Sequence, residues 1–267
     1  MRAVITGAAS GIGRSVAIRL NTDSIARDGS PARMVLADLA VGPLEAVAAE
    51  LRDAGAEVEV VIADLSNPEA SARVVKAANK FEGIDALISN AGIIHRATLL
   101  ELTLEDYERT FAINTRPTWL LAKAAHPLLK AAGGAIVATA SIAAYEPTPA
   151  LGVYSSSKAA LVMLIRQIAC DWGRYGIRAN SVSPGSTNTN ISKNAGIDAP
   201  PAATRVANNP LGFIAEPDDQ SAVIAFLVSP GARFITGTDI VVDGGARTQL
   251  MVAAGMGDPL KHAQRKN

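Results

Sequence analysis

The sequence is poor in several residue types, and each shortage excludes a class of protein. Its single cysteine, Cys170, rules out an intrachain disulfide and suits a reducing compartment; we expect it to be a small buried core residue. The three histidines, His95, His126 and His262, share no ligand spacing, so we expect no catalytic metal. Aromatic residues make up only 4%, and 25 basic residues balance 25 acidic ones. The sequence therefore lacks the excess of basic residues that is typical of nucleic-acid-binding proteins.

Long apolar runs are also missing. No run approaches the roughly 18 apolar residues that cross a bilayer, and Arg14 and Arg19 interrupt the N-terminal segment. We therefore expect a cytoplasmic protein without a membrane partner. The 267 residues are 49% hydrophobic, which is enough for a large core, and α/β chains of this length often fold as one domain.

Short apolar runs alternate with amphipathic stretches along the chain. This alternation predicts a parallel sheet with helices on both faces, as in doubly wound α/β folds, whereas a β/α barrel would need eight matched units. Helices are expected to start at Pro43 and Pro68 and to span 110–132, 154–175 and 217–228. The expected strands are 2–5, 34–37, 58–63, 86–89, 135–140, 178–183 and 240–242.

A glycine-rich turn follows the first apolar run. Residues 6–13 read Thr-Gly-Ala-Ala-Ser-Gly-Ile-Gly, and an apolar-periodic stretch comes next. Glycines permit positive φ and close backbone approach, and the helix start beyond them offers unpaired N–H groups to a phosphate. The spacing differs from Gly-x-Gly-x-x-Gly and lacks the Gly-Lys-Ser/Thr of a P-loop. It predicts a pyrophosphate site, with a ligand-free turn as the alternative.

Tyr154 and Lys158 stand one helical turn apart, and Ser141 precedes them. Residues i and i+4 share a helix face, so the lysine ammonium is expected near the phenol. Moving a tyrosine pKa from ~10 to about 7 needs roughly 4 kcal/mol. One cation about 4 Å away supplies that much at an effective dielectric of ~20. The pair thus predicts an acid–base tyrosine whose pKa is lowered by the lysine, with an ordinary surface pair as the alternative.

Together, these motifs resemble the short-chain dehydrogenase/reductase family, from Val4 to about Gly245. The resemblance implies a Rossmann-like, seven-stranded parallel sheet in a single domain. Three departures stand out: Ser89 replaces the first asparagine of Asn-Asn-Ala-Gly, Pro117 falls where a helix should run, and the loop 23–32 looks long. The matching pieces are Thr6 to Gly13, Asp64, Asn90-Ala91-Gly92, Asn114, Ser141, Tyr154 with Lys158, Asn180, Pro184-Gly185 with Thr189, and Asp243-Gly244-Gly245.

The same resemblance implies hydride transfer between NAD(H) and a secondary alcohol or ketone. Tyr154 is expected to exchange a proton with the substrate oxygen, to which Ser141 donates a hydrogen bond. Lys158 would keep the phenolate accessible, and Asn114 would bind a water that links Lys158 to solvent. The alternative is a non-catalytic dinucleotide sensor or scaffold on the same fold, although such a protein has no use for these four side chains together.

Cofactor residues are expected beyond the carboxyl ends of the strands. Asp38 closes the second strand and should accept from both ribose hydroxyls, whereas a 2′-phosphate there would cost up to ~4 kcal/mol. We therefore expect NAD(H) rather than NADP(H), with a solvated loop acid as the alternative for Asp38. The resemblance places Asp64 at the adenine, with a helix-start role as its alternative. The expected cofactor set is Gly7, Ser10, Gly11, Ile12, Gly13, Asp38, Asp64, Leu65, Asn90, Ala91, Gly92, Tyr154, Lys158, Pro184, Gly185, Thr187 and Thr189.

The sequence indicates less about the substrate than about the cofactor. Segment 186–213 is rich in Asn, Ala and Pro and is expected to be a substrate lid. The sequence has no paired arginines that would bind a carboxylate or phosphate of the substrate. A neutral small or alicyclic alcohol or ketone is therefore favoured. A loop histidine such as His95 is also often a surface or packing residue. The expected pocket residues are His95, Arg96, Ser141, Tyr145, Leu151 and Ile191.

We expect a catalytic domain over 1–245 and a C-terminal tail over 246–267. The tail is expected either to pack across a subunit boundary or to fray. Resemblance to the family suggests a homotetramer, or a homodimer, with the helices at 110–132 and 154–175 forming one interface.

Overall fold

The computed structural model describes residues 1–191, 206 and 209–249. Within them lies a seven-stranded parallel sheet of order β3-β2-β1-β4-β5-β6-β7, which confirms the predicted Rossmann-like single-domain fold. Each strand lies within one residue of its expected bounds. The strands are β1 (Arg2–Thr6), β2 (Arg33–Asp38), β3 (Glu57–Ile62), β4 (Ala86–Ser89), β5 (Ala135–Thr139), β6 (Arg178–Pro184) and β7 (Asp239–Val242).

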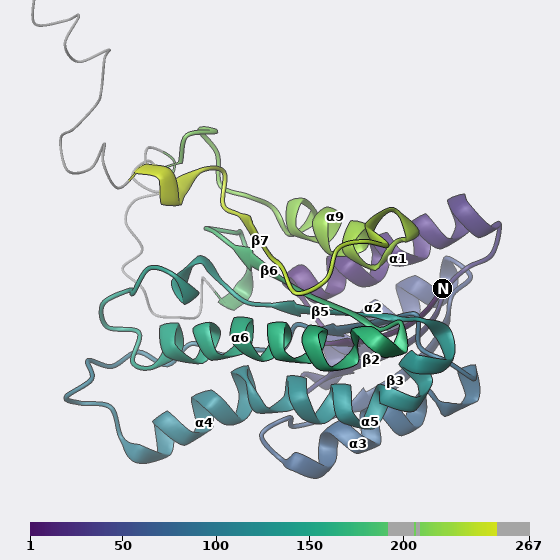
Figure 1. Cartoon of the computed structure of the whole chain (residues 1–267), viewed down its shortest axis with the longest axis horizontal. Coiled ribbons are helices and arrows are strands. Elements are labelled where there is room, and N and C mark those ends of the chain that lie inside the picture. Colours follow the sequence, from purple (N-terminus) through teal and green to yellow (C-terminus); the bar gives the residue numbers. More distant parts are fainter. Residues whose placement is uncertain (192–205, 207–208, 250–267) are drawn as a thin grey trace, which may run out of the picture.

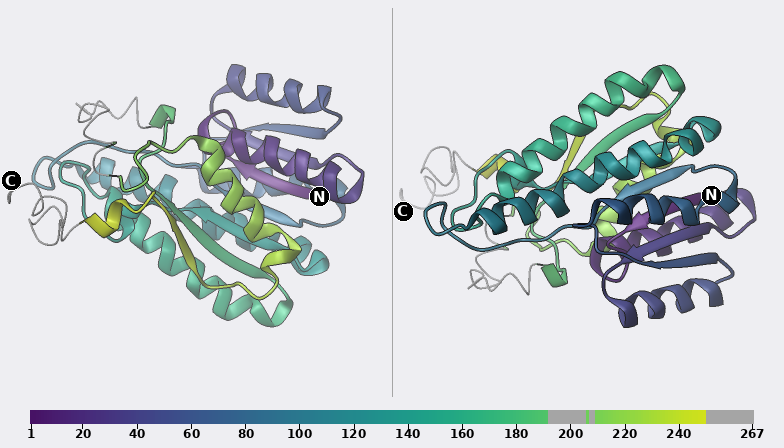
Figure 2. Two further views of the ribbon diagram at one scale, coloured as in Figure 1. Left: turned by 90° about the horizontal axis from the view of Figure 1, so that it is seen from above. Right: turned by 90° about the horizontal axis from the view of Figure 1, so that it is seen from below.

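Helices cover both faces of the sheet (Figure 1). Along β1, Ala3 and Ile5 pack into the core on one side and Val4 into the core on the other, as the two-residue period of a strand requires. The first core contains residues of α1 (Gly11–Asp28), α2 (Val41–Asp53) and α9 (Pro217–Val228). The second contains residues of α3 (Pro68–Ala77), α5 (Arg116–Ala132) and α6 (Tyr154–Trp172). Figure 2 shows the same layers from above and below.

The strand order reverses at the centre of the sheet. β1 pairs with β2 on one side and with β4 on the other, and every pairing is parallel. The chain therefore leaves β1 and β4 in opposite directions at their carboxyl ends. A crevice at such a switch point is where open α/β sheets bind ligands.

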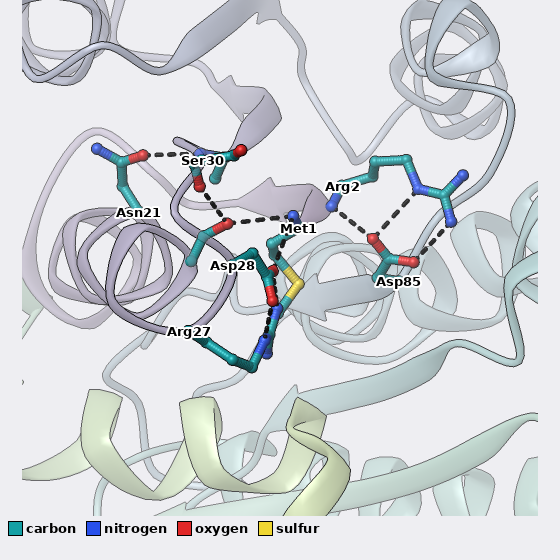
Figure 3. Close-up of polar contacts among 9 residues, drawn as sticks. Met1, Arg2, Asn21, Arg27, Asp28, Ser30 and Asp85 are labelled. Carbon is teal, nitrogen blue, oxygen red and sulfur yellow. Dashed lines mark hydrogen bonds and ion pairs between the residues drawn. The ribbon is translucent and has the colours of Figure 1, made fainter.

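An ion pair joins the amino-terminal end of β1 to the residue before β4, at the opposite ends of these strands from the crevice (Figure 3). The Arg2 guanidinium donates to both carboxylate oxygens of Asp85, at 2.7 and 3.2 Å, and the Arg2 backbone N–H donates to Asp85 at 2.7 Å. Burial raises the pKa of Asp85, but the hydrogen bonds from Arg2 outweigh it. The pKa of this carboxyl therefore lies below its usual value.

One helix expectation and one loop expectation are wrong. The segment 110–132 is not one helix, because α4 (Leu104–Asn114) ends before α5 begins at Arg116. Pro117 lies in the first turn of α5, where its missing N–H breaks no hydrogen bond. The segment 23–32 is only partly a loop, since α1 continues to Asp28 and ends at Gly29, which has a φ of 65°.

Cys170 is exposed rather than buried in the core. It lies on α6, whose inward face carries Leu161, Ile165 and Ala169. Met163, two helical turns before Cys170, is 60% exposed and marks the outward face. The phase of the helix, rather than the residue type, decides the burial of this cysteine.

Parts of the expected lid and tail lie outside the described residues, namely 192–205, 207–208 and 250–267. Within the described part, no helix combines the length and apolar character needed to cross a bilayer. The same part holds no group of three or more His, Cys, Asp or Glu residues arranged to bind a metal.

Replacing Asp85 with alanine should lower the free energy of unfolding at pH 7 by about 1–3 kcal/mol, because Arg2 loses a charge-assisted partner. The folded-state pKa of Asp85 is depressed, so its contribution is present above pH ~4 and is lost as the pH falls through the folded pKa. Urea denaturation at several pH values measures this. The matched control is Asp23→Ala, which removes an exposed partner of Arg19 and should have little effect. Equal losses in both variants would contradict the assignment.

Candidate active site

The glycine turn holds the end of β1 against the start of α1. Gly7 has a φ of 66°, and a Cβ there would lie 2.8 Å from Nδ2 of Asn90. A Cβ at Gly13 would lie 2.1 Å from the carbonyl oxygen of Gly7, so only glycine permits this approach. No acidic residue occupies the first turn of α1. The helix start therefore presents its N–H groups and positive dipole end to an anion.

Asp38 is fixed beside this turn. Its Oδ2 accepts from the N–H of Ala9 and its Oδ1 from the N–H of Ala40, both at 3.0 Å. Each oxygen keeps a second lone pair, and the residue lines the same cavity as the glycines. The carboxylate is thus oriented to accept two further hydrogen bonds.

Asn90 ties together the carboxyl ends of three strands. Its Nδ2 donates to the carbonyl oxygens of Thr6 and Gly7, both at 3.2 Å, and its Oδ1 accepts from the hydroxyl of Thr139 at 3.0 Å. The neighbouring departure, Ser89, is bonded to the hydroxyl of Thr118 on α5 at 2.7 Å. The serine therefore anchors α5 to β4.

Ser141 and Tyr154 meet in the wall of the cavity. Ser141 follows β5, and its Oγ accepts from the N–H of Ala143 at 3.2 Å in a short 3-10 turn, Ile142–Ala144. Tyr154 begins α6 and is 8% exposed. Ser141 lies close enough to the phenol to lower the pKa of Tyr154 against the effect of burial. Two adjacent hydroxyls in a cavity wall can both donate to one carbonyl oxygen.

Lys158 lies behind this pair, one turn further along α6. Its ammonium donates to the carbonyl oxygen of Thr139 at 2.8 Å and lies 5.8 Å from the centre of the Tyr154 ring. The side chain is almost fully buried, and this burial lowers the pKa of Lys158 to about 8. The amine can therefore exchange a proton close to neutral pH.

The expected lowering of the Tyr154 pKa by Lys158 is wrong for the chain alone. Burial raises the pKa of Tyr154, and the nearby hydroxyl of Ser141 opposes this only in part. The physical reason is that both side chains are buried: the ammonium donates to the carbonyl of Thr139 rather than to the phenol, and burial disfavours the charged form of each group. The protonated phenol is thus the resting form.

Asn114 lies at the end of α4. Its Oδ1 accepts from the N–H of Ile93 at 2.8 Å, and its Nδ2 donates to the carbonyl of Ile93 and to Oγ of Ser157, both at 3.0 Å. Both amide hydrogens are therefore used within the protein. The expected water link to Lys158 cannot rely on donation from this side chain.

A cavity of about 430 Å³ brings most of the expected residues together. It runs from the glycine turn past Asn90 to Tyr154 and on to the segment after β6. The expected residues that line it are Gly7, Ser10, Gly11, Ile12, Asp38, Asn90, Ala91, Gly92, Ser141, Leu151, Tyr154, Lys158, Pro184, Gly185, Thr187, Thr189 and Ile191.

Several expected catalytic and cofactor residues do not line this cavity. Gly13 and Asn114 lie behind its wall, and Leu65 is buried in the core. Asp64 is exposed, and its carboxylate accepts from the N–H of Ser66 at 2.9 Å. Hydrogen bonds from Ser66 hold the pKa of Asp64 below its usual value. This arrangement matches the helix-start alternative.

The expected substrate residues His95, Arg96 and Tyr145 also lie outside the cavity wall. Nε2 of His95 lies 3.4 Å from a carboxylate oxygen of Asp106. The hydroxyl of Tyr145 donates to Asp239 at 2.9 Å, and burial together with this bond raises the pKa of Tyr145.

Sequence reasoning missed part of the lining. Ile142 and Ala143 follow Ser141 directly, so adjacency to a motif residue was the available signal. Thr148 lies in a loop without a motif, so no signal in the sequence pointed to it. Ser186 and Asn190 belong to the expected lid, and the missed residues are Ile94, Thr139, Ala140, Ile142, Ala143 and Thr148.

Comparison with known proteins decides the family. Residues 7–247 match a family model described as enoyl-(acyl carrier protein) reductase. The chain belongs to the short-chain dehydrogenase/reductase family. The resemblance predicted from the motifs is thus confirmed, and with it membership of a family of oxidoreductases.

Relatives of this short-chain dehydrogenase/reductase span nearly its whole length. A tropinone reductase homolog from Arabidopsis thaliana is 34% identical over 92% of this chain and 78% of its own. The cis-4-hydroxycyclohexanecarboxylate dehydrogenase of Sinomonas cyclohexanicum is 38% identical over 91% of this chain and 95% of its own. The solved structure of a short-chain dehydrogenase from Burkholderia cenocepacia, in complex with NADP, has a TM-score of 0.83 and 33% identity over 92% of this chain and 97% of that one.

Proposed function

We propose that this short-chain dehydrogenase/reductase transfers a hydride between NAD(H) and a secondary alcohol or ketone, with Tyr154 as general acid and base. The observation that carries the proposal is that Ser141, Tyr154 and the buried Lys158 line the same cavity as the glycine turn. A dinucleotide sensor needs the turn but gains nothing from these side chains. The relatives named above are called reductases and dehydrogenases, which also favours an enzyme.

The cavity offers each part of a dinucleotide a suitable partner. The start of α1 would hold the pyrophosphate, Asp38 the adenosine ribose, and the segment from Pro184 to Thr189 the nicotinamide end. When bound, the oxidised cofactor supplies a hydride acceptor and a positively charged ring.

Each catalytic side chain then has one task. In oxidation, the Tyr154 phenolate takes the hydroxyl proton of the alcohol, and in reduction the phenol returns it to the carbonyl oxygen. Ser141 donates a hydrogen bond to that oxygen. Lys158, when protonated, stabilises the phenolate through its charge. Asn114 orders the backbone at Ile93 beside the lysine.

The preference for NAD(H) rests on Asp38. Its oxygens are held by two backbone N–H groups and point into the cavity, where a 2′-phosphate would meet a like charge. Arg14, a cation near the start of α1, is paired with Glu50 at 2.8 Å. The Burkholderia cenocepacia structure contains NADP, so cofactor choice needs a direct test.

The favoured substrate is a neutral small or alicyclic alcohol or ketone. Among the described lining residues, only Asp38 and Lys158 carry a formal charge, and both have other roles. Ile94 and Leu151 pack in one cluster with Tyr154, and Ile142 and Ile191 add apolar surface to the same cavity. Such a wall suits a compact hydrocarbon ring better than an anion.

We further propose a cytoplasmic homotetramer, or a homodimer, with a catalytic domain over 1–245 and a separate tail. Large side chains on the outer surfaces of three helices support self-association: Tyr107 on α4 and Trp119 on α5 are each 44% exposed, and Met163 on α6 is 60% exposed. Light scattering measures the assembly directly.

Replacing Tyr154 with phenylalanine should lower turnover by about 10² to 10⁴, because the proton transfer is lost, while cofactor binding persists. A panel of secondary alcohols with NAD⁺, followed at 340 nm, measures this. Tyr175→Phe is the matched control, since its ring packs against His126 away from the cavity. Full turnover by the Tyr154 variant would sink the mechanism, and wild-type cofactor binding without turnover on any substrate would favour the sensor.

The ratio of kcat/KM for NAD⁺ to that for NADP⁺ should reach up to about a thousandfold in the wild type. Asp38→Asn should reduce this ratio at least about tenfold, mainly by improving the use of NADP⁺, because the like charge is gone. The matched control is Asp53→Asn at the exposed end of α2, which should not change the ratio. A wild-type preference for NADP⁺ would refute the cofactor assignment.

The rate of alcohol oxidation should increase as pH rises from about 7 to 9. Oxidation needs the phenolate, and burial raises the pKa of Tyr154, so its deprotonated fraction is still growing in this range. Ketone reduction needs the phenol and should not rise. Because Lys158 has a pKa of about 8, the observed midpoint belongs to the coupled pair. An oxidation rate that falls with pH would oppose this assignment.

A further inference from the structure

The break between α4 and α5 is tied to the catalytic helix through one buried serine. Ser157 is fully buried on α6, between Tyr154 and Lys158. Its carbonyl oxygen accepts from the hydroxyl of Thr115 at 2.9 Å, and its own hydroxyl accepts from Nδ2 of Asn114 at 3.0 Å. The two residues at the helix break thus both bond to Ser157.

The direction of these bonds is fixed. The Ser157 hydroxyl donates its only hydrogen to the carbonyl oxygen of Tyr154 at 2.7 Å, so toward Asn114 it can only accept. Only Nδ2 of the asparagine amide carries hydrogens, so this contact requires Nδ2 on the side of Ser157. The orientation leaves Oδ1 for the N–H of Ile93 at 2.8 Å.

Asn114 in turn holds the backbone beside the lysine in place. It bonds both the N–H and the carbonyl of Ile93. At the preceding Gly92, an added Cβ would lie 3.3 Å from Nζ of Lys158 and 3.3 Å from Oδ1 of Asn114. The loop after β4 therefore packs directly against the ammonium and has little space to move.

We propose that Ser157 is a positioning residue for the acid–base pair: its hydroxyl orients the Asn114 amide, which holds the backbone at residues 92–93 against Lys158. The neighbouring Ser156 faces solvent and has no such role. In Ser157→Ala, one Nδ2 hydrogen of the buried Asn114 loses its acceptor, which costs free energy and loosens the amide. The catalytic consequence, unlike the positioning itself, rests on the function proposed above.

The positioning can be measured without turnover. In Ser157→Ala, the amide hydrogen of Ile93 should exchange at least about threefold faster, after normalisation to the amide of Ile5 in β1, which reports global opening. Ser156→Ala, the same substitution one position earlier, is the matched control and should match the wild type. Unchanged Ile93 exchange in a folded Ser157→Ala protein would overturn the proposal.

The kinetic arm is a double-mutant cycle measured with NAD⁺ and a secondary alcohol that the wild type oxidises. Ser157→Ala should lower kcat about fivefold and leave the dissociation constant of NADH within about twofold. In an Asn114→Ala background, the same change should have almost no further effect, because the serine acts through the asparagine. Losses that multiply would overturn the proposal. Absence of wild-type turnover would instead refute the proposed function, while amide exchange would still decide the positioning.

Discussion

The buried ammonium of Lys158 is the constraint on which the arrangement of the site depends. A lysine that is only 3% exposed needs a hydrogen-bond partner, and it finds the carbonyl of Thr139 at the end of β5. Gly92 leaves just enough space beside it, and α6 supplies it one turn after Tyr154. Three separate segments must therefore meet at one point for this charge to be accommodated.

Thr139 connects the acid–base pair to the dinucleotide crevice. Its carbonyl accepts from Lys158, and its hydroxyl donates to Asn90, which in turn holds the carbonyls of Thr6 and Gly7. One residue thus fixes the position of the lysine relative to the floor of the glycine turn. This connection explains physically how a proton-transfer group can be kept in register with a ligand that binds at the other end of the cavity.

The sequence predicted those features that depend on residue type. Strand bounds followed from apolar runs that end in glycine, proline or polar residues, and the glycines, Ser141 and Tyr154 were found because their chemistry requires those side chains. The break at Thr115 was missed, because the expectation for 110–132 was one continuous helix. Thr139 was missed because it holds Lys158 through a backbone carbonyl, which every residue has. The raised pKa of Tyr154 depends on burial and on where the lysine donates, and neither can be read from spacing.

The most direct test is the ultraviolet titration of the Tyr154 phenolate, taken as the difference between the wild type and Tyr154→Phe, with and without NAD⁺. In the chain alone, the phenolate should form above the ordinary tyrosine range, because burial raises the pKa of Tyr154. With NAD⁺ bound, the titration should move to lower pH, since a positive ring then lies beside the phenol. A titration that NAD⁺ leaves unchanged would contradict the account, because Tyr154 would then not lie next to the nicotinamide.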